Sequence, residues 1–472
     1  MSDVPIIRSP RRRFLHTLLA ISTLVMALVA VSTPSAHALT GAGTRLHDPS
    51  VIKSGSCYYA YSTGFENDAA NPTGSITVHR SCTSATGPWT DVGNTWSSTP
   101  AWITQRLGST PPNIWAPDIN YFDGEYHLYY GASLWGTATA AMGLLTSASP
   151  EGPWTDRGMV TDANYPIDPD VVRGADGRLY ISWGSFTGGA SWMHVLDENT
   201  GKLSTTDNNL WKIATGVEGV SIVQNGGYFY LFGSKGTCCS GTNSTYYTVV
   251  GRSASVTGPY LDQAGNNVAS GAGTVALRGT WPRVAAGGGD VYADGSSLFF
   301  AYHYYDAASS GRETLDIRPL TFAGGWPVLG DPLGKPELAL QAQHSSKCLD
   351  VWALSTADGA AVNQGYCNGG GNQLWTIQPD GGGGDRIVNV NSGKCLQPQN
   401  GSTDAGAVMV QASCVGTSTQ RWTLTPTIGG YTTIKNASSN LCLEVYGNAT
   451  GNGVAANQWA CNGGSNQSWL RG

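Results

Sequence analysis

DPDVVRGADGRLYISW, residues 168–183, joins an acidic turn to a strand-like run rich in aromatic and aliphatic residues. The same two-part unit recurs five times along the chain. The aromatic runs occupy 58–62, 126–130, 179–183, 228–232 and 298–302, and eight to eleven residues before them lie markers at Asp48, Asp118, Asp168, Glu218 and Gly288. Five repeated strand–turn–strand units predict a five-bladed β-propeller.

The composition favours an all-β protein. Only 12% of the residues are charged, whereas the chain contains 63 glycines and 10% aromatic residues. A typical globular chain has about 25% charged residues, so long helices and coiled coils are disfavoured. A hydrophobic content of 40% excludes a disordered protein. We therefore expect aromatic strands joined by glycine-rich turns.

A stricter repeat occupies the C-terminal part of the chain. Three cysteine pairs have their members 19 residues apart and step by 47 residues: Cys348 and Cys367, Cys395 and Cys414, Cys442 and Cys461. Three tryptophans step by the same 47, each with a glutamine two residues earlier: Trp375, Trp422 and Trp469. Three copies at one period predict three equivalent units around a pseudo-threefold axis. Residues 337–472 thus resemble a ricin-type β-trefoil lectin domain, the fold of family 13 carbohydrate-binding modules.

This resemblance implies that each cysteine pair forms a disulfide and that each repeat can hold one sugar. An acidic residue, a stacking aromatic and an asparagine would form each site. The third repeat keeps Glu444, Trp459 and Asn466, and the first keeps Asp350 and Asn372, with Tyr366 or Trp352 replacing the aromatic expected at Gly365. The second repeat, with Gln397 and Ala412, is expected to be structural only. A trefoil with no sugar site is the alternative.

The first 38 residues predict an export signal of the twin-arginine type. Arg11, Arg12 and Arg13 precede an apolar run at 18–31, and Ala36-His37-Ala38 offers a cleavage site. A retained amphipathic anchor is the alternative, since the run is shorter than the ~20 residues of a membrane span. Without this segment 22 basic and 31 acidic residues remain, which makes a nucleic-acid partner unfavourable.

Four of the five markers in the N-terminal repeat are carboxylates. Innermost propeller strands line a central channel, so Asp48, Asp118, Asp168 and Glu218 are expected to converge there. Surface Asp-Pro turns are the structural alternative. Crowded carboxylates raise one another's pKa, and a protonated acid opposite an ionised base is suited to glycoside hydrolysis.

Three segments, 47–51, 115–119 and 167–171, resemble glycoside hydrolase family 43, and the order of motifs in 218–253 is similar to that family's arabinan endo-1,5-α-L-arabinosidases. The resemblance implies an inverting mechanism with Asp48 as general base, Glu218 as general acid and Asp168 as the residue that orients the acid and adjusts its pKa. It also implies a substrate site that includes Trp115, Asp118, Tyr165, Gly184, Ser185 and Phe186.

Two positions depart from the family pattern. Glu218 is followed by Gly219 and Val220 instead of Ala-Pro, and Gly288 stands where the family commonly has a histidine for a central calcium or similar ion. We therefore assign no metal ligand and expect no required cofactor, with a central calcium ion as the alternative that the family resemblance leaves open. We interpret His303 as a packed strand residue rather than a ligand. Cys57 and Cys82 are expected to form a disulfide, whereas the bonding of the adjacent Cys238 and Cys239 is left open.

The chain is thus expected to consist of an export signal (1–38), a propeller (39–330), a linker (331–336) and a trefoil (337–472). The first hypothesis is a secreted, monomeric hydrolase of plant cell-wall arabinan, including the arabinan side chains of pectin. Its trefoil would bind polysaccharide, with xylan or galactan as further ligands, and it would bind neither nucleic acid nor membrane. An exo-acting α-L-arabinofuranosidase, a β-xylosidase and a galactanase are alternatives within the family. A non-catalytic lectin with two domains is the alternative of another class.

Overall fold

The computed structural model describes residues 38–39 and 44–472, so the predicted export signal lies almost wholly outside the described residues. Within this described part, no helix is long and apolar enough to cross a membrane. The described residues contain one α-helix, α1 (Ala101–Leu107), and otherwise fold into strands joined by turns and short 3-10 helices. The predicted all-β class is confirmed.

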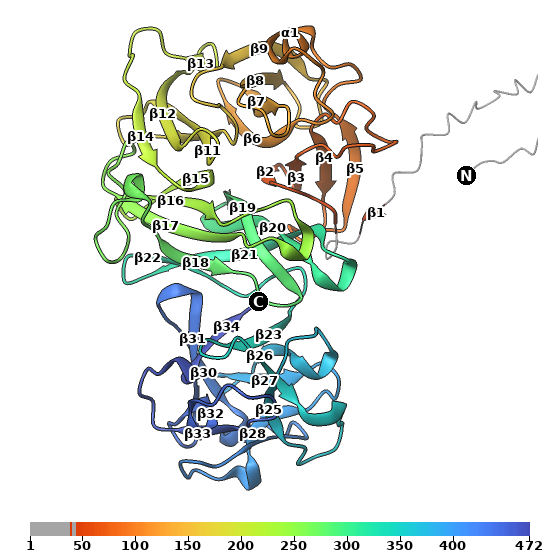
Figure 1. Cartoon of the computed structure of the whole chain (residues 1–472), viewed down its shortest axis with the longest axis vertical. Coiled ribbons are helices and arrows are strands. Elements are labelled where there is room, and N and C mark those ends of the chain that lie inside the picture. Colours follow the sequence, from red (N-terminus) through yellow and green to blue (C-terminus); the bar gives the residue numbers. More distant parts are fainter. Residues whose placement is uncertain (1–37, 40–43) are drawn as a thin grey trace, which may run out of the picture. The chain divides into compact units, whose positions relative to one another are not determined.

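Residues 38–329 form five antiparallel sheets, drawn in red to teal in Figure 1. In chain order the sheets contain β1 (Ala38–Leu39), β2 (Ser50–Ser54), β3 (Cys57–Ser62), β4 (Thr77–Ser81) and β5 (Trp89–Asn94); β6 (Trp115–Phe122), β7 (Glu125–Ser133), β8 (Ala140–Ser147) and β9 (Thr155–Thr161); β10 (Asp170–Arg173), β11 (Leu179–Ser185), β12 (Ala190–Asp197), β13 (Lys202–Leu203) and β14 (Trp211–Ala214); β15 (Glu218–Asn225), β16 (Tyr228–Lys235), β17 (Tyr247–Ser253) and β18 (Thr274–Arg278); and β19 (Arg283–Asp294), β20 (Ser297–Asp306), β21 (Arg312–Ala323) and β22 (Trp326–Leu329).

The five sheets are the blades of a propeller, as predicted. Their first strands lie next to one another in the order β2, β6, β10, β15 and β19, and β19 returns to β2 to complete the circle. The aromatic runs form the second strands, β3, β7, β11, β16 and β20. Their side chains fill the spaces between blades, where Tyr61, Tyr130, Trp183, Phe232 and Tyr302 are fully buried.

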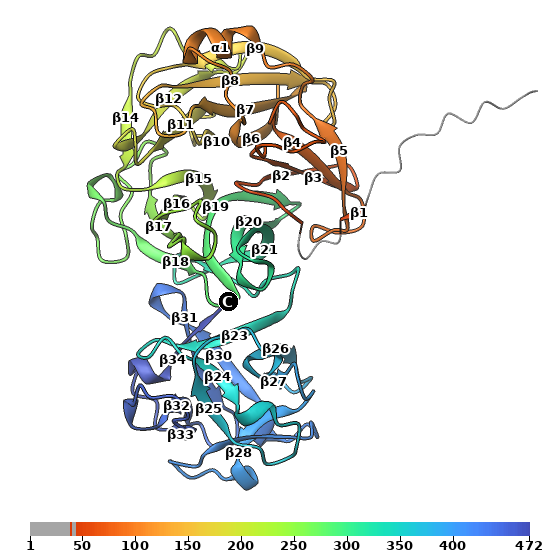
Figure 2. The same cartoon turned by 45° about the vertical axis from the view of Figure 1, so that its right-hand side comes forward.

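The C-terminal part folds into a separate twelve-stranded β-structure, coloured teal to blue in Figure 2. Its strands are β23 (Glu337–Ala342), β24 (Cys348–Val351), β25 (Val362–Gly365), β26 (Leu374–Pro379), β27 (Asp385–Asn389), β28 (Cys395–Pro398), β29 (Met409–Ala412), β30 (Trp422–Pro426), β31 (Tyr431–Asn436), β32 (Cys442–Val445), β33 (Ala456–Trp459) and β34 (Ser468–Arg471). The boundaries of the domains and of the linker at 331–336 stay predictions.

The 47-residue period appears directly in the core of this C-terminal part. Trp375, Trp422 and Trp469 are fully buried in one apolar cluster. Each indole N–H donates to the carbonyl oxygen of the residue 26 positions earlier, at 3.0, 3.1 and 3.0 Å. Each repeat also contains one disulfide, Cys348–Cys367, Cys395–Cys414 or Cys442–Cys461. The repeated contacts show three equivalent units, and the trefoil fold is confirmed.

Candidate active site

A residue with left-handed backbone geometry lies at an equivalent position near the start of the inner strand of every blade, and β19 has a second one, Ala285. The equivalent residues are Asp48, Ala116, Asp168, Gly219 and Gly288, with φ between 39° and 56°. Asp118 and Glu218 therefore do not occupy the position equivalent to Asp48, contrary to our expectation; Ala116 and Gly219 do. Asp118 lies two residues beyond its blade's left-handed residue, and Glu218 lies one residue before it. The pairing register shifts after Trp115 and after Glu218, and sequence spacing does not reveal such irregularities.

A second layer of polar side chains lies two residues further along each inner strand. Ser50, Asp118, Asp170, Ser221 and Asp290 each accept a hydrogen bond from a backbone N–H of the next blade. The donors are Ile119, Val171, Ile222, Val291 and Val51, at 3.1, 2.8, 3.2, 3.1 and 3.4 Å. We call these five acceptors the inter-blade ring. Asp118, predicted to bind substrate, is a buried member of it and also accepts from Asn120 Nδ2 at 2.7 Å.

The carboxylate of Asp48 is held from several sides. His47 Nδ1 lies 2.7 Å from its Oδ2, and the Thr63 hydroxyl donates to the same oxygen at 2.9 Å. The backbone N–H of Asp48 donates to His303 Nδ1 at 3.1 Å. Burial alone would raise the pKa of Asp48, but the charge and hydrogen bond of His47 outweigh it and lower this pKa to about 2. Asp48 is therefore an ionised base across the neutral range.

The two histidines beside Asp48 differ in protonation. Burial lowers the pKa of His47, but Asp48 outweighs burial and the net pKa is raised. Burial and the neighbouring His47 lower the pKa of His303 to about 3, so His303 stays neutral. The two rings stack with their centroids 3.9 Å apart. His47 is thus the cationic partner of Asp48, and His303 is a packed, fully buried residue that accepts the N–H of Asp48.

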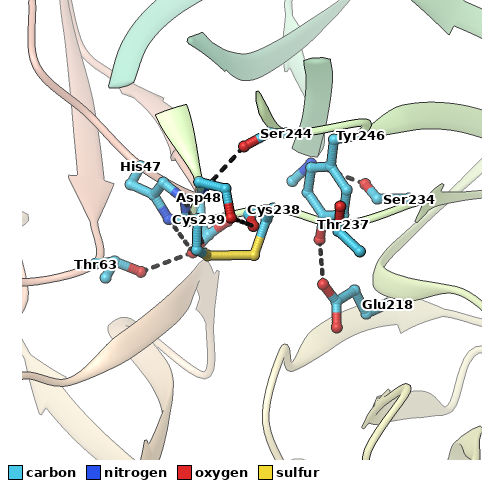
Figure 3. The surroundings of a disulfide bond; sticks show 12 residues. His47, Asp48, Thr63, Glu218, Ser234, Thr237, Cys238, Cys239, Ser244 and Tyr246 are labelled. Atoms are coloured by element: carbon cyan, nitrogen blue, oxygen red, sulfur yellow. Dashed lines mark hydrogen bonds and ion pairs between the residues drawn. A yellow bond between two sulfur atoms is a disulfide. The ribbon is translucent and has the colours of Figure 1, made fainter. Parts of the chain in front are cut away.

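The pKa of Glu218 is shifted in the opposite direction from that of Asp48. Burial raises its pKa to about 7, and the charge of Asp48 adds to this rise. The Tyr246 hydroxyl donates to Glu218 Oε1 at 2.6 Å, and a backbone hydrogen bond from Phe186 also reaches the carboxylate; both lower the pKa in part. Figure 3 shows Tyr246 pointing at Glu218, with His47 and Asp48 on the other side of the view. Glu218 can therefore carry a proton at neutral pH.

Asp168 lies beside the acid. Its Oδ2 accepts the backbone N–H of Gly219 at 2.9 Å, so it holds the residue that follows Glu218. Burial and the charges of Glu218 and Asp48 raise the pKa of Asp168 well above its usual value. Asp48, Asp168, Tyr246 and members of the inter-blade ring line one cavity of about 40 Å³. That volume holds roughly three water molecules.

The other predicted substrate-binding residues occupy the same end of the propeller. Trp115 begins β6, and its ring meets that of the exposed Trp135 edge to face at 6.0 Å. The Tyr165 hydroxyl lies 3.1 Å from Ser133 Oγ, and Phe186 is 39% exposed. Gly184 and Ser185 are buried at the end of β11. At Gly184, with φ 138°, a Cβ atom would lie 2.2 Å from the Ala190 carbonyl oxygen, so this position serves close packing.

Sequence reasoning missed four residues that contact the candidate acid and base. His47 and Tyr246 lay inside quoted motifs, but nothing in their spacing assigned them a partner. Thr63 and His303 reach Asp48 from other strands, which only the folded chain reveals. Trp135 was missed because it lies in the turn between β7 and β8, outside every repeated run.

Two groups of potential metal ligands come together among the described residues: His47, Asp48 and His303, and Asp118, Asp170 and Asp290. The calcium expected from the family does not fit the first group. A Cβ atom at Gly288 would lie 2.5 Å from Asp48 Oδ1 and 2.7 Å from His303 Cε1, so these residues fill the place of the usual histidine. In the second group, every carboxylate accepts a backbone N–H.

The predicted sugar sites of the trefoil differ in exposure. Asp350 accepts from Asn372 Nδ2 at 3.1 Å and from Gln373 Nε2 at 2.6 Å, and it is partly exposed. Glu444 is buried and accepts from Asn457, Asn466 and Gln467. Exposed aromatic rings lie in both repeats: Trp352, Tyr366, Tyr446 and Trp459. In the second repeat Gln420 donates to Gln397, with no carboxylate at that position.

Comparisons with known proteins agree with this geometry. Residues 42–327 match Glycosyl hydrolases family 43, and residues 337–469 match the Ricin-type beta-trefoil lectin domain. An extracellular endo-alpha-(1->5)-L-arabinanase of Bacillus subtilis is 35% identical over 67% of this chain and 97% of its own. An extracellular exo-alpha-(1->5)-L-arabinofuranosidase of Cellvibrio japonicus is 31% identical over 61% and 86%.

Among solved structures, the Cellvibrio cellulosa alpha-L-arabinanase complexed with arabinohexaose is 29% identical, with a TM-score of 0.55, and the match covers 61% of this chain and 96% of that one. A family 43 endo-arabinanase from Bacillus licheniformis is 33% identical with a TM-score of 0.54, over 61% and 99%. The family match spans more than half of the chain and coincides with the propeller that positions Asp48, Asp168 and Glu218. The chain is a glycoside hydrolase and belongs to glycosyl hydrolase family 43.

Proposed function

We propose that this chain hydrolyses α-1,5-L-arabinofuranosidic bonds in plant arabinan, with endo action and inversion of anomeric configuration. The observation that carries the proposal is the divergence of two carboxyl groups, with a pKa of about 2 at Asp48 and about 7 at Glu218. Such a divergence assigns the base and the acid. Relatives named for endo and for exo action on α-1,5-linked arabinose support the substrate class.

In this mechanism Glu218 donates its proton to the leaving-group oxygen while Asp48 removes a proton from the attacking water. Tyr246 and the Phe186 backbone N–H hold the carboxylate that remains on Glu218. Asp168 orients the acid through Gly219. Because Asp48 is ionised above about pH 3 and Glu218 is protonated below about pH 7, kcat/KM should be bell-shaped between these limits.

A product assay tests the reaction. The enzyme is incubated with linear 1,5-α-arabinan and with an aryl α-L-arabinofuranoside, and the products are separated by size while proton NMR follows their anomers. A ladder of oligosaccharides that first appear as the inverted anomer is expected. Release of single arabinose units would indicate exo action, and net retention would exclude single displacement. No cleavage of either substrate, with cleavage of xylan or galactan oligosaccharides, would favour the other family activities.

The trefoil is proposed to hold the enzyme on polysaccharide outside the cell, after export through residues 1–38. Exposed aromatic rings next to buried polar clusters in the first and third repeats support this role. Two relatives named as extracellular support export. The fully paired second repeat, through Gln397 and Gln420, is proposed to bind no sugar.

Substitution of one aromatic ring tests the anchoring role. Removing a large aromatic anchor costs over ~1 kcal/mol, so Trp459→Ala should weaken binding to insoluble arabinan or xylan about tenfold. Trp352→Ala provides the same measurement for the first repeat. Hydrolysis of short soluble oligosaccharides should be unchanged, because they need only the propeller. If neither variant changes the pull-down with any plant polysaccharide, the trefoil has no anchoring role.

A further inference from the structure

The loop between β16 and β17 contains a disulfide between adjacent residues, Cys238 and Cys239. Figure 3 shows this disulfide between two groups of side chains, His47 with Asp48 and Tyr246 with Glu218. Cys238 and Cys239 are not among the residues that line the cavity of Asp48 and Asp168. The proposed reaction uses neither sulfur atom. The disulfide nevertheless lies where the surroundings of the base and of the acid meet.

A chain of three contacts leads from the disulfide to the base. The backbone N–H of Cys239 donates to the Tyr305 hydroxyl at 2.6 Å. That hydroxyl lies 3.1 Å from His47 Nε2, and His47 Nδ1 lies 2.7 Å from Asp48 Oδ2. Cys239 Sγ itself is 3.9 Å from His47 Nε2. Tyr305 is fully buried, so its hydroxyl depends on protein partners, which are Cys239, His47 and the side chain of Ser244.

Two features fix the N–H of Cys239 in place. Cys239 has φ 64°, a left-handed backbone that is unfavourable for a residue with a Cβ atom. Closure of a ring between neighbouring side chains prevents the relaxation of this backbone. On the other side, Cys238 packs against the small apolar cluster of Tyr246, Ala285 and Tyr305. The disulfide thus connects the tyrosine that contacts the acid to the tyrosine that contacts His47.

We propose that the Cys238–Cys239 disulfide is a positioning element for Asp48, because it fixes the Cys239 N–H on Tyr305 and so holds His47 against the carboxylate. This role deepens the proposed function, since it assumes that Asp48 is the base. Loss of the disulfide lets residues 238–239 relax and removes the Cys239 N–H from the Tyr305 hydroxyl. The side-chain hydrogen bond with Ser244 remains at Tyr305, but without the Cys239 N–H the hydroxyl holds His47 less firmly, and Asp48 loses part of the contact that keeps it ionised.

Other charged groups also face this pair and enter the expected pH dependence. Glu313 on β21 and Glu218 on β15 raise the pKa of His47, and Arg45 forms an ion pair with Glu313 at 3.2 Å. His303 on β20 and Thr63 lower the pKa of Asp48. Among the described residues, none of these five groups forms a hydrogen bond with Cys238 or Cys239. Their effects should therefore persist when the disulfide is removed, and the change should be confined to the contribution of His47.

The test compares two disulfides removed from the full-length enzyme. Cys238→Ala/Cys239→Ala removes the adjacent pair, and Cys57→Ala/Cys82→Ala removes a disulfide of the first blade as the matched control. Tyr305→Phe breaks the same chain of contacts and leaves both cysteines in place. Circular dichroism and Tm establish folding. The kcat, KM and pH profile on arabinan are measured together with the ¹⁵N NMR titration of His47.

For the adjacent pair we expect kcat to fall about tenfold with KM within about twofold, and the acid limb of kcat/KM to move up by about one pH unit. Tyr305→Phe should shift the acid limb in the same direction, and the combined variant should be no worse than the more impaired parent. The control should leave the acid limb in place. A folded Cys238→Ala/Cys239→Ala enzyme with an unmoved acid limb, or additive effects with Tyr305→Phe, would overturn the proposal.

The NMR titration separates this proposal from the proposed substrate. The His47 pKa should fall in both chain-breaking variants whether or not arabinan is hydrolysed. If the wild-type enzyme does not cleave arabinan but the His47 pKa falls as expected, only the substrate assignment fails. If arabinan is cleaved and the His47 pKa is unchanged in Cys238→Ala/Cys239→Ala, only the positioning role fails.

Discussion

Two layers of carboxylates surround the propeller channel, and their pKa values differ. The outer layer contains Asp48, Asp168 and Glu218, which lie two or three residues before the members of the inter-blade ring on the same inner strands. In the outer layer, Asp48 has a pKa of about 2 and Glu218 of about 7. In the inter-blade ring, burial raises the pKa of Asp290 to about 6 and that of Asp118 and Asp170 well above the usual value. Carboxyl groups thus have the proposed catalytic roles in one layer and accept hydrogen bonds between blades in the other.

The difference lies in the partners. Each ring member accepts one backbone N–H from the next blade, and no cation contacts the three acids among the hydrogen bonds and ion pairs of the described residues, so burial is the largest cause of their raised pKa values. In the outer layer the partners differ in charge. Asp48 contacts the cationic His47, whereas Glu218 accepts a hydrogen bond from the neutral hydroxyl of Tyr246. Unequal partners separate the two pKa values, and this separation makes an acid and a base out of two carboxyl groups.

The strongest test of the comparison exchanges one carboxyl group in each layer for an amide. Glu218→Gln removes the proton donor and Asp48→Asn removes the base, so each should reduce kcat/KM on arabinan at least ~10²-fold. Asp170→Asn, the matched control in the ring, should change it less than about threefold, because an amide oxygen still accepts the Ile222 N–H. Near wild-type activity in Glu218→Gln or Asp48→Asn would remove that residue from the mechanism.

A second test changes one partner of the outer layer and leaves the carboxyl groups intact. Tyr246→Phe removes the hydrogen bond that lowers the pKa of Glu218, so the alkaline limb of the pH profile should move up from about 7. A loss of kcat of about tenfold should accompany the shift, because the carboxylate that remains on Glu218 after proton transfer loses the hydrogen bond from Tyr246. Tyr247→Phe, at the neighbouring position, is the control. An alkaline limb that moves down would show that Tyr246 stabilises the protonated acid instead.

The smallest effect is expected in the ring and appears in stability. Burial and the neighbouring charges raise the folded-state pKa of Asp170, so its contribution to stability is full below about pH 4 and is lost as the pH rises through the raised value. Asp170→Asn should therefore raise Tm by about 2 °C at pH 8 and by less at pH 4. Thermal unfolding at both pH values measures this. A lower Tm at pH 8 would mean that the ring requires its third carboxylate.

The fold could be predicted from the sequence because each sequence repeat corresponds to a repeated structural contact. The 47-residue period reports a tryptophan that makes the same hydrogen bond three times, and the aromatic runs report the second strand of every blade. The alignment of the acids around the channel could not be predicted, because Asp118 lies two residues after and Glu218 one residue before the left-handed position that Asp48 occupies in its own blade. The register shift beside that position is shared by β6, β15 and β19, so spacing along the sequence does not separate the three strands. One partner of Asp48, His303, comes from a strand 255 residues away, a pairing that local pattern does not encode.

The inter-blade ring has one seam that differs from the others. Four of its links join blades that follow each other in the chain, whereas the link from Val51 to Asp290 spans 239 residues. Mechanically, the propeller is a split ring closed by a clasp of side chains, with Ser50 and Ser221 both donating to Asp290. Asp48 lies on the first blade, at one side of this seam, and His303 and Tyr305 lie on the fifth blade, at the other side. Glu218 belongs to the fourth blade. Opening of the clasp would therefore separate the base from two of its supports and leave the acid with Tyr246.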